Sequence, residues 1–328
     1  INLVCVPLIA ENNIEPKNYI ELVQLFEDWR DFENPPLMNG APDYTKRRFD
    51  RAQKEFNALQ NRLENVDTTN WPIYYQVDWW IVRAEMNGYD FNHRVLRPWV
   101  RDPAFYQTIW MYQSDVPAHE GPTNHGVLEF WMFDFPLNND RAKDLADQLK
   151  TIPNFLFQAK GNLTGNARDL WVAGIENFKE QADNLEAIRK KVKKHHGKSL
   201  DGLLSAPLKN AKEANDDFIK WLEQKAPTKN GPSGIGKENY TWYQKNVHLV
   251  PLSWEEEVSL LQRELDRSWS SLKMEEHLNR NLPPMISAKT EQEFDIMKEK
   301  GVRRMMDFLS DHDIMYIKDN MEPALREH

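Results

Sequence analysis

Cysteine is almost absent from this 328-residue chain, which contains only Cys5. A single thiol excludes an internal disulfide and any metal site built from several cysteines. Glycine is also sparse, at 13 residues, and its scarcity favours helices over glycine-rich turns. The chain has no excess of positive charge either. Its formal net charge of −9 argues against nucleic acid as the main partner, because phosphate binding needs a basic surface.

The sequence also lacks an apolar run long enough to cross a bilayer, so we expect no integral membrane segment. The run INLVCVPLIA, at Ile1–Ala10, has two interpretations. It is either the remnant of an export signal, which would favour an exported or periplasmic protein, or the start of a buried element. We therefore separate residues 1–15 from a helical domain over residues 16–328. Because Glu322–His328 reads as the start of a helix, we expect this domain to be the N-terminal part of a longer protein.

Apolar residues recur at spacings of three and four throughout the long segments, which predicts an all-α fold of about ten helices without a significant sheet. The segment from Pro72 to Phe91 is expected to be central, with Ile73, Val77 and Trp80 on its buried face. Pro153 is expected to separate one helix from the next. The aromatic segment that ends near Gln113 is expected to be a short helix. The other expected helices span residues 18–32, 45–63, 140–150, 166–188, 200–224, 253–278 and a segment that starts at Thr290.

The stretch from Pro227 to Leu278 combines a loop with a long helix. Three glycines between Gly231 and Gly236 give the loop unusual backbone freedom, and charged and aromatic residues follow at once. Ser253 and Glu256 have the spacing of a capping box, which predicts a helix start at this point. A flexible loop with polar groups, attached to a rigid helix, is typical of a binding site. It is equally typical of an ordinary surface connection.

Metal-ligand patterns are weak in this sequence. His119 and Glu120 precede His125 by six and five residues, and Gly121 and Pro122 interrupt any helix between them. A zinc helix needs two histidines one turn apart, so we expect no zinc site here. The basic run from Arg189 to His196 fits the end of a helix, where cations complement the dipole. A lipid-surface role for that run is the alternative.

Several segments, in this order along the chain, resemble the bacterial family known as domain of unknown function 885. They comprise a Gln-x-Asp helix, an Asp-Pro-x-x-Tyr junction, a helix with an Ile-Pro pair that ends in Asn-Leu, a Gly-x-x-x-Tyr loop and the helix start after it. In this chain they are Gln76–Asp78, Arg101–Tyr106, Leu145–Leu163, Gly236–Tyr240 and Pro251–Glu256. The resemblance extends from about Ile20 to Leu309 and implies an all-helical fold similar to gluzincin-type zinc metallopeptidases, often exported or lipid-anchored.

The resemblance implies a hydrolase that acts on peptides, but the family's zinc motif, a His-Glu followed by Pro-Gly-His, is not in this chain. We therefore expect no catalytic residue and no cofactor here, and zinc only in a longer form. In such a form, Tyr240 or Tyr243 would donate a hydrogen bond to the polarised substrate carbonyl. Lys237 or Glu238 would bind a charged end of the peptide. The alternative is a non-catalytic binding or scaffold protein with the same helical shell.

Overall fold

The computed structural model describes residues 16, 18–113, 126–283 and 286–327. Two of the sequence-based interpretations concern residues outside this described part. They are the export-signal remnant at Ile1–Ala10 and the histidines His119 and His125 with Glu120.

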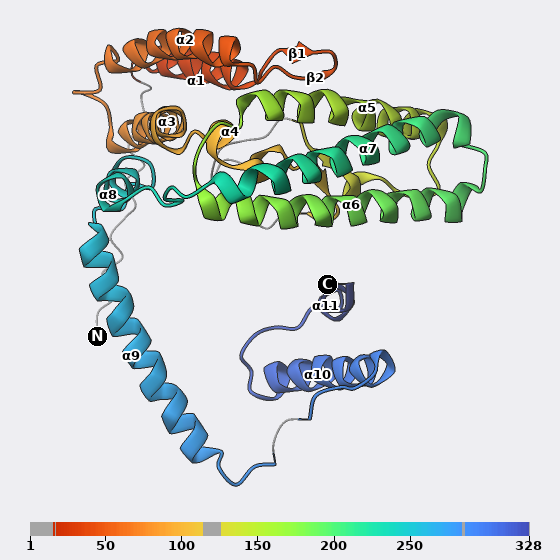
Figure 1. Cartoon of the computed structure of the whole chain (residues 1–328). Helices are drawn as coiled ribbons and strands as arrows, with labels where there is room; N and C mark the ends of the chain where they lie inside the picture. Colours follow the sequence, from red (N-terminus) through yellow and green to blue (C-terminus); the bar gives the residue numbers. More distant parts are fainter. Residues whose placement is uncertain (1–15, 17, 114–125, 284–285, 328) are drawn as a thin grey trace. The chain divides into compact units, whose positions relative to one another are not determined.

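The chain divides into two compact units, Ile1–Ser259 and Leu260–His328. Helices dominate both units (Figure 1), and the predicted all-α fold is confirmed. The first unit contains α1 (Tyr19–Glu33), α2 (Lys46–Glu64), α3 (Ile73–Phe91), α4 (Pro98–Arg101), α5 (Asn139–Asn162), α6 (Arg168–His196), α7 (Asp201–Lys225), α8 (Lys237–Asn246) and the first residues of α9 (Trp254–Leu278). The second unit contains the remainder of α9, with α10 (Glu291–Asp311) and α11 (Met321–Glu327).

Strands are minor elements of the described chain. A two-residue antiparallel pair, β1 (Leu37–Met38) and β2 (Ala41–Pro42), precedes α2. A two-residue parallel pair joins β3 (Ile109–Trp110) to β4 (Leu128–Glu129). Short helical turns complete the unit: the π-turn η1 (Asn92–Leu96) and the 3₁₀ turns η2 (Pro103–Tyr106), η3 (Phe130–Met132) and η4 (Ala226–Thr228).

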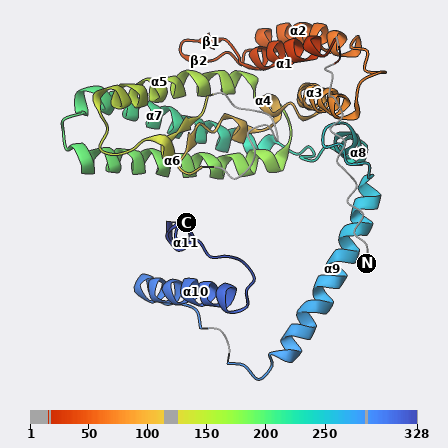
Figure 2. The same ribbon diagram turned by 180° about the vertical axis from the view of Figure 1, so that it is seen from behind.

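Two hydrophobic cores stabilise the first unit. The larger core lies among α5, α6 and α7, which run side by side in both views (Figures 1 and 2), and includes Trp171, Phe178 and Phe218. The smaller core lies among α1, α2 and α3, around Trp29 and Phe56. Each core forms because its helices carry apolar stripes, which are buried by packing against another helix.

Several helices of this structure begin at capping residues of the sequence. The backbone N–H of Glu256 donates to Ser253 Oγ at 3.3 Å, and the backbone N–H of Ser253 donates to Glu256 Oε2 at 2.7 Å. The predicted capping box at the start of α9 is thus confirmed. The hydroxyl of Thr290 likewise accepts from the backbone of Glu293 at the start of α10. Gly197 directly follows the last residue of α6, and its positive φ of 57° is typical of a glycine at the C-terminus of a helix.

The predicted buried face of α3 is wrong. Ile73, Val77 and Trp80, expected inside, are about half exposed or more. The helix instead buries Tyr75, Val82 and Met86 in the smaller core. Both sets recur at helical spacing, so α3 has two apolar faces, and periodicity does not indicate which of them another helix covers.

Two helix predictions also need correction. Pro153 does not separate two helices but lies inside the continuous α5. The missing N–H of Pro153 weakens one turn, but Leu149 and Ile152 before it and Leu156 after it are buried in the larger core, which favours a continuous helix. The segment that ends near Gln113 is not a helix. It follows the turn-rich stretch that ends at Tyr106 and contains the strand β3, because the backbone N–H groups of Thr108 and Ile109 donate to Gln181 instead of to helix carbonyls.

A buried polar network joins α6, α7 and the segment before β3. Gln181 Oε1 accepts from the backbone N–H groups of Thr108 at 2.7 Å and Ile109 at 3.2 Å. Gln181 Nε2 donates to Asn215 Oδ1 at 2.9 Å, and Asn215 Nδ2 donates to the carbonyl of Phe178 at 2.9 Å. Gln181, Asn215 and Thr108 are fully buried, so each bond replaces a lost bond to water.

We expect Gln181→Leu to lower the free energy of unfolding by roughly 2 to 5 kcal/mol, because it leaves buried groups of three residues without a partner. Gln224→Leu, an exposed change on α7, is the matched control. Urea denaturation measures both. Equal stability of the two variants would contradict a stabilising role for the network.

Candidate functional site

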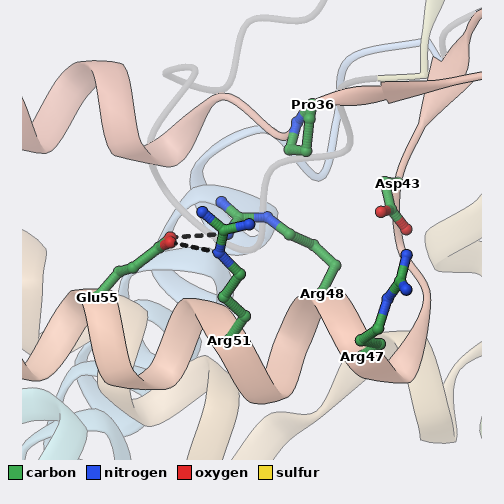
Figure 3. Close-up of a pocket in the computed structure, with 6 residues that line it drawn as sticks. All are labelled: Pro36, Asp43, Arg47, Arg48, Arg51 and Glu55. Atoms are coloured by element: carbon green, nitrogen blue, oxygen red, sulfur yellow. Dashed lines mark hydrogen bonds and ion pairs between the residues drawn. The ribbon is translucent and has the colours of Figure 1, made fainter.

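An open pocket of about 580 Å³ lies at the start of α2, and arginine side chains form much of its wall. They come from the first two turns of the helix. Figure 3 shows the pocket with an acidic residue at each end, Glu55 at one and Asp43 at the other. The lining residues are Pro36, Asp43, Arg47, Arg48, Arg51 and Glu55.

Local turn chemistry places these arginines. Asp43 Oδ1 accepts from the backbone N–H of Thr45 at 3.0 Å and turns the chain from β2 towards the helix. The hydroxyl of Thr45 then accepts from the backbone N–H of Arg48 at 3.3 Å, as an N-cap does. Arg47 therefore lies in the first turn, and Arg51 follows on the same face one turn later.

The acids of the pocket do not balance its arginines. Arg48 Nη1 and Arg51 Nε donate to Glu55 at 2.8 and 2.7 Å. Both bonds hold the pKa of the Glu55 carboxyl below its usual value, and the bond from Arg48 has the larger effect. Arg47 forms no ion pair with any residue that the structure describes, although Asp43 lies beside it (Figure 3). Three cations and two carboxylates leave the pocket with one net positive charge.

A carboxyl group with a shifted pKa lies nearby, between α1 and α3. Arg30 Nη1 contacts Glu33 at 2.8 Å and Glu85 at 3.2 Å, so one cation serves two carboxylates. An ion pair alone would lower the pKa of Glu33. Burial outweighs it, with repulsion from Glu85 in addition, and raises the pKa of Glu33 to about 7.

His93, in the π-turn η1, is a second buried titratable group. Its Nδ1 donates to the carbonyl of Tyr89 at 3.0 Å in the neutral tautomer, and its ring stacks on that of Tyr89 at 4.0 Å. Its Nε2 is buried and has no hydrogen-bond partner among the described residues. Burial lowers the pKa of His93 to about 4, and Arg48 contributes to the shift. Burial also raises the pKa of Tyr89.

These shifted groups adjoin the arginine pocket through Arg48, whose charge acts on both Tyr89 and His93. Titratable groups with shifted pKa values are enriched at functional sites. The sequence did not predict this region, because its residues come from α1, α2, α3 and the π-turn η1. The available signal was the spacing of Arg47, Arg48 and Arg51 on one helix, whereas the pocket itself arises only from the fold.

The structure places two of the four predicted site residues against the first turn of α9. Tyr240 donates its hydroxyl hydrogen to Glu257 Oε2 at 2.5 Å, and this bond raises the pKa of Tyr240. Lys237 Nζ lies 3.8 Å from the centre of the Trp254 ring and 3.4 Å from Glu255 Oε1. Both contacts join α8 to α9.

The other two predicted residues do not share these contacts. The ring of Tyr243 packs on Phe91 at the end of α3, at 4.8 Å, and edge-on against His248. Glu238 is exposed in the first turn of α8. Trp242 stacks on Phe91 with an angle of 9° between the rings. Lys237 and Tyr240 therefore lie together, whereas Tyr243 turns towards α3.

The glycine loop before α8 is tied to the rest of the unit. Arg101 Nη2 donates to three loop carbonyls, at 3.0 Å to Ser233 and at 3.4 and 3.3 Å to Pro232 and Gly234. A Cβ at Gly231 would lie 2.7 Å from the carbonyl oxygen of Asn166, so this position requires glycine. The loop thus has a defined position that directs the start of α8.

No group of three or more His, Cys, Asp or Glu side chains in the described chain has an arrangement that fits a metal ion. None of the described helices combines the length and the apolar character that a bilayer crossing requires.

Comparisons with known proteins show a likeness of fold. No family model matches the chain, and no curated protein matches its sequence. Among solved structures, the fold is similar to that of a protein described as a "putative lipoprotein of unknown function" from Shewanella oneidensis, with a TM-score of 0.53 and 14% sequence identity. The match covers 92% of this chain and 57% of that chain, so this chain spans little more than half the length of that protein.

The raised pKa of Glu33 predicts a pH-dependent effect of Glu33→Gln. The native carboxyl binds a proton more tightly than the unfolded one, so wild-type stability falls as the pH rises from about 4.5 through 7. We expect the variant to match the wild type near pH 4.5 and to exceed it by about 1 to 3 kcal/mol at pH 8. Thermal unfolding across this range tests it.

Glu64→Gln, an exposed change near the end of α2, is the control and should show no such trend. If Glu33→Gln is instead the less stable protein at pH 8, the ion pair with Arg30 outweighs burial.

Proposed function

We propose that this chain is the N-terminal helical part of an exported, zinc metallopeptidase-like hydrolase that acts on peptides. The resemblance to domain of unknown function 885 supports the class of reaction. The similar solved structure, described as that of a "putative lipoprotein", supports export. The neighbour's greater length supports a further part of the protein, and the residues that bind zinc and activate water would lie in that part.

The observation that carries the proposal is an apolar face of α9 that the rest of its own unit leaves exposed. Leu261, Leu265 and Trp269 follow at spacings of four, and each exposes more than half of its side chain. In α10, Phe294 and Met305 are about equally exposed. Rows of large apolar side chains in water are unfavourable and mark surfaces that contact another protein surface. A further part of the same protein would cover them.

Tyr240 is the residue of this chain that we assign to substrate binding. Its bond to Glu257 raises the pKa of the phenol and keeps it protonated, which is the form that donates a hydrogen bond. Donation to a substrate carbonyl would replace the bond to Glu257. Lys237 lies one turn earlier, where its ammonium group would attract a carboxylate of the peptide. Glu238, exposed in the same turn, would attract an amino group, and Tyr243 would be a second donor.

A non-catalytic scaffold with the same helical shell is the second candidate. It is favoured by the contacts that these residues already form within the chain. Lys237 contacts Trp254, Tyr240 contacts Glu257, and Tyr243 packs on Phe91. In that case Lys237, Tyr240 and Tyr243 serve only to hold α8 between α3 and α9.

Tyrosine-to-phenylalanine variants distinguish the two candidates in a form of the protein that extends beyond His328. We expect Tyr240→Phe to lower kcat/KM for peptide hydrolysis roughly ten- to a hundredfold, because it removes a donor to the developing oxyanion. The melting temperature should not change, because the ring remains. Tyr243→Phe should reduce the rate less, since its ring packs on Phe91.

Tyr316→Phe, a change at a strongly exposed tyrosine, is the control. If hydrolysis is normal in Tyr240→Phe, the α8 residues are structural, and the scaffold account of this corner is correct.

A further inference from the structure

The arginine pocket has a composition that helix stability does not explain. Lys46, Arg47 and Arg48 occupy the first turn of α2, which contains no acidic residue. The positive end of the helix dipole lies at this turn, so cations here are unfavourable for the helix. Two of these cations, Arg47 and Arg48, line the pocket, and an anionic ligand would explain their presence there.

The arginines differ in how firmly they are held. Arg48 is mostly buried, with 14% of its side chain exposed, and its guanidinium lies 5.9 Å from the Phe32 ring and pairs with Glu55. These contacts hold the Arg48 side chain in one position in the pocket wall. Arg47 and Arg51 are exposed, one turn apart on the same face. Arg47 has no ion pair with the described residues, so its donors are available to a ligand.

We propose that the pocket lined by Arg47, Arg48 and Arg51 binds the carboxylate or phosphate group of a small ligand. Guanidinium groups bind both kinds of oxyanion through paired N–H donors. Arg47 is the primary contact of the bound anion, and Arg51 is the second. Arg48, which is mostly buried, adds positive charge to the pocket wall. The volume of about 580 Å³ is in the range of small-molecule sites and exceeds the space that a single inorganic ion needs.

Asp43 places a negative charge in the pocket, which opposes the effect of the arginines on an anion. Its carboxylate lies beside Arg47 (Figure 3) and repels a bound anion. Its Oδ1 holds the turn before α2 through the N–H of Thr45, and an asparagine at this position has the same acceptor. Asp43→Asn thus removes the repulsion without removing the turn, and it should increase anion affinity. This binding site does not depend on the proposed hydrolase function.

Calorimetric titration of the 328-residue chain at low ionic strength tests the proposal, with citrate and pyrophosphate as probes. We expect saturable binding of at least one probe, at one molecule per chain. Arg47→Gln should weaken it about tenfold, since it removes a charged hydrogen-bond donor. Asp43→Asn should tighten it. The probe that binds more tightly identifies the ligand as carboxylate- or phosphate-bearing.

Lys46→Gln is the matched control, because it removes one positive charge from the same helix turn at a residue that pairs with Asp50 outside the pocket. It should change affinity less than twofold. The proposal is wrong if neither probe saturates, or if Lys46→Gln weakens binding as much as Arg47→Gln. Circular dichroism melting checks that each variant is folded, as we expect for exposed Lys46 and Arg47 and for the half-buried Asp43.

Discussion

The contact of Phe91 with Trp242 and Tyr243 is the packing interaction on which the predicted site depends. Phe91 is almost fully buried at the end of α3, and both rings from α8 lie on it. The side-chain amide of Asn87 donates to the carbonyl of Asn246 at 3.0 Å, so the same end of α3 also holds the end of α8. The contacts with α3 fix the position of α8, and α8 in turn places Lys237 and Tyr240 against α9. The position of both predicted site residues therefore depends on α3.

The same turn of α3 connects to the arginine pocket. Tyr89 and His93 lie two residues on either side of Phe91 and face the aromatic residues of α1 and α2 instead of α8. A helix brings residues at such spacings to different faces, so one short segment contacts both regions. Glu33 and His93 lie in environments that disfavour their charged forms, because burial costs a charged group its hydration. The pocket and the α8 corner thus share one structural support.

The sequence predicts much of the fold, because apolar spacing marks the long helices and capping residues mark the starts of several of them. Ser253 and Glu256 form their capping box as expected, and Gly197 ends α6 with a positive φ. The errors come from tertiary packing. The two apolar faces of α3 look alike in sequence, and only contact with α1 and α2 selects one of them. The arginine pocket is not predictable in this way, since Asp43 and Arg47 meet through the turn between β2 and α2.

We propose that this chain is the helical part of a zinc-dependent peptide hydrolase. Metal content tests it most directly, in purified protein that extends beyond His328, with peptide hydrolysis measured on the same samples before and after chelation. The account predicts stoichiometric zinc, hydrolysis that disappears with the chelator, and its return when zinc is added back. A folded longer protein that contains no zinc, or that hydrolyses peptides equally well after chelation, would contradict it.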